Sequence, residues 1–404
     1  MIKRIINSSQ LLTLRGEGLG IIRDGGLAIR DGRIIDVGTT EEILKKFPEG
    51  EVIDAKGSLL LPGFVDPHTH LVFAGTREDE FDLRLKGVSY KEIAERGGGI
   101  LSTVKATREA SEDELFEIAW KRIREIISWG TTTLEIKSGY GLSLRDELKI
   151  LRVIKRLRDK SKIDIVPTFL GAHSFPEEIE KGDYIKIILE EMIPEVARNG
   201  LARFCDVFCE NFVFNYEESK HILLAGRSQG LLPKIHGDEI EHSGGARLAS
   251  EIRAVSCDHL LYSTEEDLIK MRDNGVIAVL LPATSLFLKS RKKPLVDFMR
   301  RIGLTIALGS DYNPGSSMIY QMPIVISLGC LIYGLTIEEA IRGATINGAK
   351  AIKMEDEIGS LESGKKADIL ILDAQNYKHI PYQFGRNLIR TVIKKGEVIY
   401  EKTC

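Results

Sequence analysis

Two histidines separated by one residue, His68 and His70, end an apolar run in the segment LLLPGFVDPHTH. Residues i and i+2 of a strand point to the same side, so both imidazoles can bind one ion. Such a tripeptide is a weak signal by itself, because it often arises by chance. Its context is stronger, since His236 and Asp311 end apolar runs further along the chain. Imidazole nitrogens and a carboxylate oxygen are ligands of catalytic zinc-type ions, so these four residues predict a metal site.

Each of these residues also has a purely structural interpretation. His236 is suited to a hydrogen-bonded place in the core, and Asp311 to a helix cap before YNPGSS. The distribution of histidines favours the metal site, because five of the eight in the chain stand at the ends of apolar runs. These five are His68, His70, His173, His236 and His259.

The stretch between the two chain ends alternates short apolar runs with longer segments of helical periodicity. Eight such runs occur, among them TTTLEIKS, DIVPTFLGAH and LTIALGSD. Ser111 and Glu114 form a capping box, and Gly130 can end the helix that follows them. The pattern predicts an α/β protein with a (β/α)8 TIM-type barrel over residues 61–354, whose chemistry lies at the carboxyl ends of the strands. A doubly wound open sheet is the alternative, although the chain has no G-x-G-x-x-G or Walker motif.

The two chain ends share a different pattern. Asp31-Gly32 and Lys395-Gly396 each separate two apolar arms, and such pairs suit the tight turn of a β-hairpin. Residues 1–60 and 355–404 therefore predict one small β-sandwich module, formed from both ends of the chain and interrupted by the barrel.

Composition narrows the expected location and partners. The 404 residues carry a net charge of −3, which favours neither nucleic acid nor an anionic membrane surface. No apolar run reaches the roughly 18 residues that a membrane-spanning helix needs, and the start of the sequence lacks a secretory signal pattern. Five scattered cysteines predict reduced thiols. We expect a cytoplasmic protein that acts on a small molecule.

The order H-x-H, His, Asp, together with LPGFVDPHTH, ATINGAKAI and GSLESGKKADILILD, resembles the amidohydrolase superfamily of metal-dependent hydrolases. Within it, HTHLVFAGTREDEF, EIKSGYGL, KIHGDEIEHSGGA and SDYNPGSS resemble the imidazolonepropionase family, and the resemblance covers nearly the whole chain. That family opens the ring of 4-imidazolone-5-propanoate with water to give N-formimino-L-glutamate during histidine degradation. The resemblance implies the same activity here, with zinc or iron as the metal and a homodimeric assembly.

The expected number of metal ions follows from one difference between this sequence and the superfamily pattern. Many superfamily members hold two metals bridged by a modified lysine at the end of strand four, but RFCDVFCE offers no lysine there. Lys137 ends strand two and is a poor substitute by position. We therefore expect one divalent ion.

The implied substrate is a cyclic amide with a propanoate arm. Asp311 is the expected general base, His259 can polarise the carbonyl oxygen, and Glu239 can hold a ring N–H or relay a proton. Without the resemblance, His259 would be interpreted as a core histidine and Glu239 as a solvated acid in the loop GDEIEH.

The propanoate arm needs cationic or hydroxyl donors. Arg77 can clamp a carboxylate, although by itself it would be an ordinary surface arginine beside Glu78 and Asp79. Tyr140 lies between glycines in SGYG, which lets its loop approach a ligand closely. For the segment after Asp311 we expect a loop that turns into a helix and presents backbone N–H groups to an anion. The resemblance implies substrate contacts for Arg77, Tyr140, His173, Glu239, Asn313, Gly315 and Ser316.

Two other functions stay open at this point. A different amidohydrolase, such as one that deaminates a nucleobase-like ring, would share the metal site and would have less need of Arg77. A non-catalytic scaffold could keep the barrel, but it would not need to keep all four predicted metal ligands.

Overall fold

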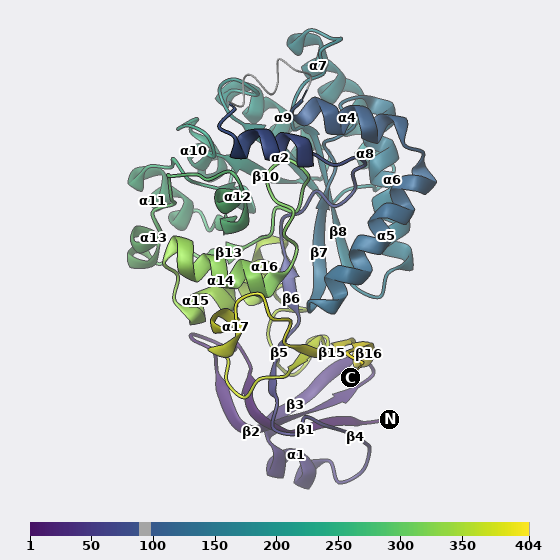
Figure 1. Ribbon diagram of the computed structural model, residues 1–404, viewed down its shortest axis with the longest axis vertical. Helices are drawn as coiled ribbons and strands as arrows, with labels where there is room; N and C mark the ends of the chain where they lie inside the picture. Colours follow the sequence, from purple (N-terminus) through teal and green to yellow (C-terminus); the bar gives the residue numbers. More distant parts are fainter. Residues whose placement is uncertain (89–97, 404) are drawn as a thin grey trace.

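The computed structural model describes residues 1–88 and 98–403 and contains a barrel and a separate sheet (Figure 1). Eight parallel strands pair with their neighbours in chain order to form a nearly closed barrel. Backbone hydrogen bonds from Asp311 to His68 (N–O 2.9 Å) and from His70 to Tyr312 (3.0 Å) join the segments after the first and last strands. The barrel prediction is confirmed, and the doubly wound alternative is wrong. The strands are β6 (Phe64–Asp66), β7 (Thr131–Lys137), β8 (Asp164–Ala172), β9 (Phe204–Cys209), β10 (Leu232–Gly237), β11 (Ser256–His259), β12 (Ile277–Leu280) and β13 (Ile306–Leu308).

Helices surround the barrel strands in Figure 1. The Ser111 hydroxyl accepts from Glu114 N, the Glu114 carboxylate accepts from Ser111 N, and Gly130 follows the helix with φ +89°, so the predicted bounds of this helix are confirmed. The helices are α2 (Glu78–Leu85), α4 (Ile100–Glu109), α5 (Glu112–Ser128), α6 (Leu144–Lys160), α7 (Lys181–Ile187), the π-helical turn η1 (Ile188–Met192), α8 (Ile193–Arg198), α9 (Tyr216–Ser228), α10 (Gly245–Glu251), α11 (Glu265–Asp273), α12 (Pro282–Phe287), α13 (Val296–Ile302), α14 (Met322–Tyr333), α15 (Ile337–Gly343) and α16 (Ile346–Ala351).

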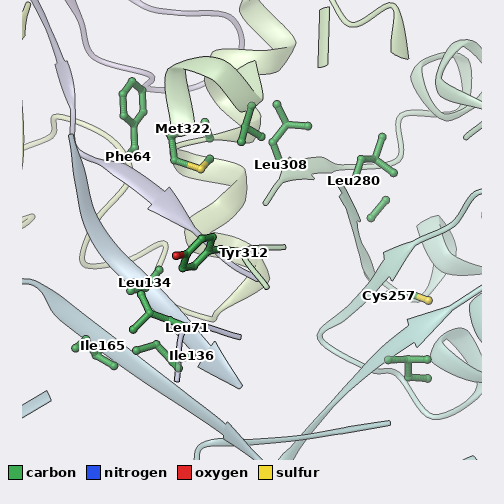
Figure 2. Close-up of a cluster of buried hydrophobic side chains, with 14 of the residues drawn as sticks. Phe64, Leu71, Leu134, Ile136, Ile165, Cys257, Leu280, Leu308, Tyr312 and Met322 are labelled. Atoms are coloured by element: carbon green, nitrogen blue, oxygen red, sulfur yellow. The ribbon is translucent and has the colours of Figure 1, made fainter. Parts of the chain in front are cut away.

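Side chains alternate between the two faces of each barrel strand. Leu134 and Ile136 of β7 belong to the hydrophobic core between strands and helices, part of which Figure 2 shows. Glu135 and Lys137 alternate with them and therefore face the interior of the barrel, where they are fully buried. The barrel thus has an apolar outer layer and, at this level, a charged interior.

The second sheet is built from both chain ends. Strand β5 pairs antiparallel with β14, which joins the N-terminal strands to the C-terminal ones in one mixed sheet. Asp31 (φ +52°) with Gly32 (φ +76°), and Lys395 (φ +49°) with Gly396 (φ +76°), make tight turns, so both predicted hairpins are confirmed. The elements are β1 (Lys3–Leu12), β2 (Ile21–Arg30), β3 (Arg33–Thr39), α1 (Thr40–Lys46), β4 (Glu51–Asp54), β5 (Leu59–Pro62), β14 (Ile369–Leu372), α17 (His379–Tyr382), β15 (Ile389–Lys394) and β16 (Glu397–Glu401).

Four of the five cysteines lie among the described residues. Cys205, Cys209 and Cys257 are buried, and Cys330 is partly exposed; all four are free cysteines. Cys404 lies outside the described residues. Among residues 1–88 and 98–403, none of the helices combines the length and the apolar character needed to cross a membrane.

An ion cluster joins the barrel to the end sheet. Asp164, at the start of β8, lies 2.8 Å from Lys394 Nζ, 3.2 Å from Lys366 Nζ and 3.5 Å from Lys395 Nζ. Burial would raise the pKa of Asp164, but these lysine charges outweigh it and lower the pKa to about 2. The Asp164 side chain is 19% exposed, so solvent screens the cluster only in part.

Replacing Asp164 by Asn should therefore destabilise the protein at pH 7 by about 2 kcal/mol, the free energy that corresponds to this pKa shift. The folded-state pKa is depressed, so the contribution is present above pH 4 and is lost as pH falls toward 2. Denaturant unfolding of both proteins between pH 7 and pH 2 measures the difference, which should shrink below pH 4. A difference that stays constant down to pH 2 would show that the lost stability is not electrostatic.

Candidate metal centre and active site

Three histidines converge at the carboxyl ends of the barrel strands. His68 and His70 follow β6, and His236 lies near the end of β10, so residues far apart in the sequence meet at one rim. The ligand atoms of the three side chains lie within 4.8 Å of one another, and all three are buried. The Nε2 atoms of His70 and His236 are 3.4 Å apart. This spacing suits nitrogen ligands of one ion.

The fourth predicted ligand, Asp311, lies beside this group. Its Oδ1 atom is 3.3 Å from His68 Nε2 and 3.5 Å from His70 Nε2. The Nε2 atom of His68 is buried and makes no hydrogen bond with the described residues, so it is available to a ligand. Three imidazole nitrogens and one carboxylate oxygen fit a zinc-type divalent ion, and a catalytic site of this kind keeps a position for water.

Asp311 is held in place from several sides. Its backbone has φ +52°, and its N–H bonds to the His68 carbonyl. Its Oδ2 atom accepts hydrogen bonds from Thr284 Oγ1 (2.6 Å) and Ser316 Oγ (3.3 Å). The helix-cap interpretation of Asp311 is wrong, because the next helix, α14, begins at Met322. Oδ1 is thereby directed toward the histidines.

A pocket of about 210 Å³ is lined by Glu239 and His259 among other residues, and the His259 ring lies 5.6 Å from the His68 ring. His259 Nδ1 lies 3.5 Å from Glu239 Oε1. Burial lowers the pKa of His259 to about 4, so its imidazole is neutral at pH 7. Burial and the charge of Asp311 raise the pKa of Glu239 to about 8, so this side chain can carry a proton near neutrality. Glu239 is therefore not a solvated loop acid.

Arg77 is not an ordinary surface arginine, because its side chain is only 10% exposed. Its Nε and Nη2 atoms donate to Glu80 Oε2, at 2.9 and 2.7 Å, and not to Glu78 or Asp79. Its Nη1 edge lies against Gly315, where an added Cβ would be 2.2 Å from Nη1. One edge of the guanidinium is therefore held by Glu80, and the other faces the loop after Asp311.

Tyr140 and His173 lie beside the metal centre. The His173 ring stacks on His70 with centroids 4.9 Å apart, and the Tyr140 ring lies 5.8 Å from His70 and 5.4 Å from His173. Burial lowers the pKa of His173 to about 3, so its imidazole is neutral at pH 7. Tyr140 is 3% exposed.

The loop after Asp311 differs from the expectation. Asn313 Oδ1 accepts from Gly315 N (2.9 Å) and Ser316 N (2.8 Å), so these N–H groups are already bonded within a turn. The loop does not lead directly into a helix. The prediction of free backbone donors for an anion is therefore wrong, because the Asn313 side chain accepts both groups first. Asn313 Nδ2 in turn donates to the Asp311 carbonyl (2.7 Å).

Comparison with known proteins agrees with this arrangement. Residues 51–106 and 231–399 each match the amidohydrolase family, and residues 25–49 match an imidazolonepropionase-like composite domain of bacteria. The chain is 49% identical to an imidazolonepropionase of Geobacillus kaustophilus, over 96% of each chain, and 48% identical to one of Symbiobacterium thermophilum, over 98% and 97%. The chain belongs to the imidazolonepropionase family.

A solved structure shows the same fold at lower identity. An adenosine deaminase of Xanthomonas campestris with bound zinc superposes with a TM-score of 0.74 at 18% sequence identity, and the match covers 98% of this chain and 92% of that one. The fold is thus shared with a deaminase, so the fold by itself does not identify the substrate.

Beneath the metal centre of this imidazolonepropionase family member lies a buried charge network that the sequence did not reveal. Lys137 Nζ lies 2.7 Å from Asp206, 3.2 Å from Glu135 and 3.6 Å from Asp258, and all four side chains are fully buried. Burial alone would lower the pKa of Lys137, but these three carboxylates raise it. A second lysine, Lys234, lies 2.7 Å from Glu135. Two ammonium groups thus balance most of the charge of three carboxylates.

This network reaches the histidines from below. Asp258 Oδ2 lies 2.6 Å from His68 Nδ1, and Asp206 Oδ2 lies 3.0 Å from His236 Nδ1. Partners of this kind orient an imidazole so that its other nitrogen faces the ion. The signal in the sequence was the presence of charged residues inside apolar strands, as in TTTLEIKS and AVSCDH.

A further carboxylate fixes the loop that carries Glu239. Glu210 Oε1 accepts from Glu239 N (2.7 Å) and from Ile240 N (3.0 Å). Burial raises the pKa of Glu210 to about 7. Glu210 directly follows β9 in the sequence. The residue at the end of β9 therefore sets the position of the loop that follows β10.

Proposed function

We propose that this protein hydrolyses 4-imidazolone-5-propanoate to N-formimino-L-glutamate, as a hydrolase of a cyclic amide C–N bond in histidine degradation. The observation that carries the proposal is the near full-length identity of 48–49% with two imidazolonepropionases. The convergence of His68, His70, His236 and Asp311 at the barrel rim supports it.

His68, His70, His236 and Asp311 would hold one divalent ion, zinc or iron. When bound, the ion supplies Lewis acidity and lowers the pKa of a water molecule toward neutrality. A single ion is supported by Lys137, whose ammonium group already occupies the space between three carboxylates below the histidines.

The chain's own residues then move the protons. Asp311 accepts a proton from the attacking water and passes it to the ring nitrogen that leaves. His259, as a neutral imidazole, donates a hydrogen bond from Nε2 to the carbonyl oxygen as negative charge develops there. The Nε2 atom of His259 is buried and makes no hydrogen bond with the described residues, which supports this role. Glu239 binds a ring nitrogen.

The propanoate arm would bind at the Arg77 side of the site. The Nη1 edge of Arg77 donates to the arm's carboxylate, with Tyr140 and His173 on the neighbouring side. Asn313, Gly315 and Ser316 would contact the substrate on this side of the site. Their turn leaves room for the guanidinium only because residue 315 lacks a side chain.

The chain's organisation and setting belong to the same proposal. Residues 1–60 and 355–404 form one module around the catalytic domain of residues 61–354. The protein acts as a cytoplasmic homodimer on a small molecule, without nucleic acid or membrane partners. Sedimentation of the purified protein tests the dimer.

Replacing Arg77 by Leu tests the substrate assignment. We expect kcat/KM for 4-imidazolone-5-propanoate to fall by about 10- to 100-fold, mostly through KM, because a charge-assisted hydrogen bond to the carboxylate is lost. The loss of the substrate's ultraviolet absorbance measures turnover. Arg145→Leu, at an exposed arginine in α6, is the matched control and should leave both constants unchanged.

The same variant separates this proposal from the second candidate, a ring-deaminating amidohydrolase. The fold shared with an adenosine deaminase favours that candidate. Unchanged kcat/KM in Arg77→Leu, together with ammonia release from a nucleobase-like ring by the unmodified protein, would support the deaminase and contradict the proposal.

A further inference from the structure

The loop that carries Tyr140, residues 138–142, connects β7 to α6 and is buried along its whole length. Gly139 has φ +112°, a conformation that other residues rarely adopt. A Cβ on Gly141 would lie 2.4 Å from the backbone nitrogen of Glu147. The two glycines therefore let the loop pack directly on the first turn of α6.

Glu147 accepts three backbone hydrogen bonds from this loop. Its Oε2 atom accepts from Gly139 N (3.0 Å), and its Oε1 atom accepts from Gly141 N (2.7 Å) and Leu142 N (2.9 Å). The Glu147 side chain is fully buried. Since the accepted N–H groups lie on both sides of Tyr140, the carboxylate fixes the backbone from which the phenol projects.

Arg108, at the end of α4, binds the same loop through its carbonyl groups. Its Nε atom donates to Gly141 O (2.6 Å), and its Nη2 atom donates to Leu142 O (2.9 Å). A carboxylate and a guanidinium thus hold the loop from its donor and acceptor sides. Gly139 O lies 3.1 Å from His173 Nδ1. The backbone of this loop therefore also contacts His173, which lies beside Tyr140.

The other end of α4 is tied to Arg77. Glu80, which holds Arg77, also accepts from Gly99 N (3.0 Å) and Ser102 Oγ (3.2 Å) at the start of α4. One helix therefore carries contacts to both groups that the proposed function assigns to the propanoate arm, through Glu80 at its start and Arg108 at its end.

We infer that Glu147 and Arg108 are positioning residues that hold Tyr140 for the carboxylate arm of the substrate, and so set the specificity for arm-bearing substrates. This inference rests on the proposed function, because that function makes Tyr140 an arm contact. Neither residue touches the metal ligands. Gln at position 147 keeps the shape but has one acceptor oxygen, so at least one buried loop N–H loses its partner.

Two ring analogues, assayed as competitive inhibitors, isolate the contribution of the arm: 3-(imidazol-4-yl)propanoate and 4-methylimidazole, which has the same ring without the carboxylate. For Glu147→Gln we expect the inhibition constant of 3-(imidazol-4-yl)propanoate to rise, while that of 4-methylimidazole changes less than twofold. The ratio of the inhibition constant of 4-methylimidazole to that of 3-(imidazol-4-yl)propanoate should therefore fall 5- to 50-fold. KM for the substrate should rise by a similar factor, while kcat stays within threefold. Arg108→Lys, at a partly exposed position, should give the same pattern more weakly.

Asp146→Asn is the matched control, because Asp146 lies next to Glu147 on α6 and bonds to Ser143 instead of the loop. It should leave the ratio of inhibition constants and KM unchanged.

Tyr140→Phe tests separately whether Tyr140 contacts the arm and whether Glu147 and Arg108 position it. If Tyr140→Phe lowers the ratio but Glu147→Gln and Arg108→Lys both keep it, the positioning inference is overturned and the proposed function stands. If Tyr140→Phe itself keeps the ratio, the arm assignment of Tyr140 fails, and the inference fails with it. If Glu147→Gln does not fold, the ratio of inhibition constants measured for Arg108→Lys tests the positioning inference by itself.

Discussion

Replacing Asp311 by Asn should lower kcat by about a thousandfold, within the range that loss of a positioned general base causes. Asn has the same shape, so it can occupy the same position after β13. Its amide cannot accept a proton from water, and only one of its two terminal atoms can accept a hydrogen bond. In Asp311 both oxygens are engaged: Oδ2 with Thr284 (2.6 Å), and Oδ1 close to His68 Nε2 (3.3 Å). The variant therefore loses the base without losing the packing.

Steady-state rates measured through the ultraviolet absorbance of the substrate, at saturating added metal, check this expectation. Saturating metal matters because Asp311 is also a proposed ligand. Asp267→Asn is the matched control: Asp267 is a buried aspartate that lies 3.0 Å from His242 and is not among the proposed metal ligands or substrate contacts. Turnover by Asp311→Asn within tenfold of the unmodified protein would assign the base to another residue.

The barrel and the convergence of His68, His70 and His236 were predictable, because the strands and turns that bring these residues together follow short-range rules. Asp31-Gly32 predicted its hairpin from turn chemistry, and the apolar runs predicted parallel strands from their length and their separation by helices. Once the runs are strands of a barrel, their carboxyl ends meet at one rim. His68 and His236, separated by 168 positions in the sequence, then become neighbours.

The supporting residues could not be found in the same way, because their roles depend on contacts across the barrel. Asp206, Asp258 and Lys137 come from three different strands, and each could have been an isolated charge at a strand end. Glu147 was hidden differently: it occupies an ordinary position in the first turns of α6, where an acid is expected near a helix start. Only the structure shows that its carboxylate turns back to the loop before the helix.

The loop after Asp311 shows where a general rule gave the wrong detail. A helix start is a good source of free N–H groups for an anion, and YNPGSS suggested one. Asn313 instead accepts the N–H groups of Gly315 and Ser316, so the loop is closed on itself. The guanidinium of Arg77 is then the strongest donor left for a carboxylate in that region, which moves the expected anion contact from backbone to side chain.

Replacing His236 by Ala should weaken metal binding by more than about a hundredfold, since that much is lost when only the partners of a ligand are removed. His236 supplies one of three nitrogens that lie within 4.8 Å of one another, and its Nε2 atom faces His70 Nε2 at 3.4 Å. The three remaining proposed ligands, His68, His70 and Asp311, cannot complete the coordination of the ion. In addition, Asp206 and Lys137 would remain buried beneath an empty position, with one of their contacts gone.

Competition with a chromophoric chelator measures the affinity of the metal-free protein for zinc, independently of turnover. His242→Ala removes a histidine that also pairs with a buried aspartate, so it controls for loss of an imidazole as such. We expect His242→Ala to bind one ion with unchanged affinity, and His236→Ala to lose both the ion and the activity at substoichiometric metal. If His236→Ala kept full affinity, β10 would not contribute a ligand, and the convergence of the barrel strands on one cation would have to be abandoned.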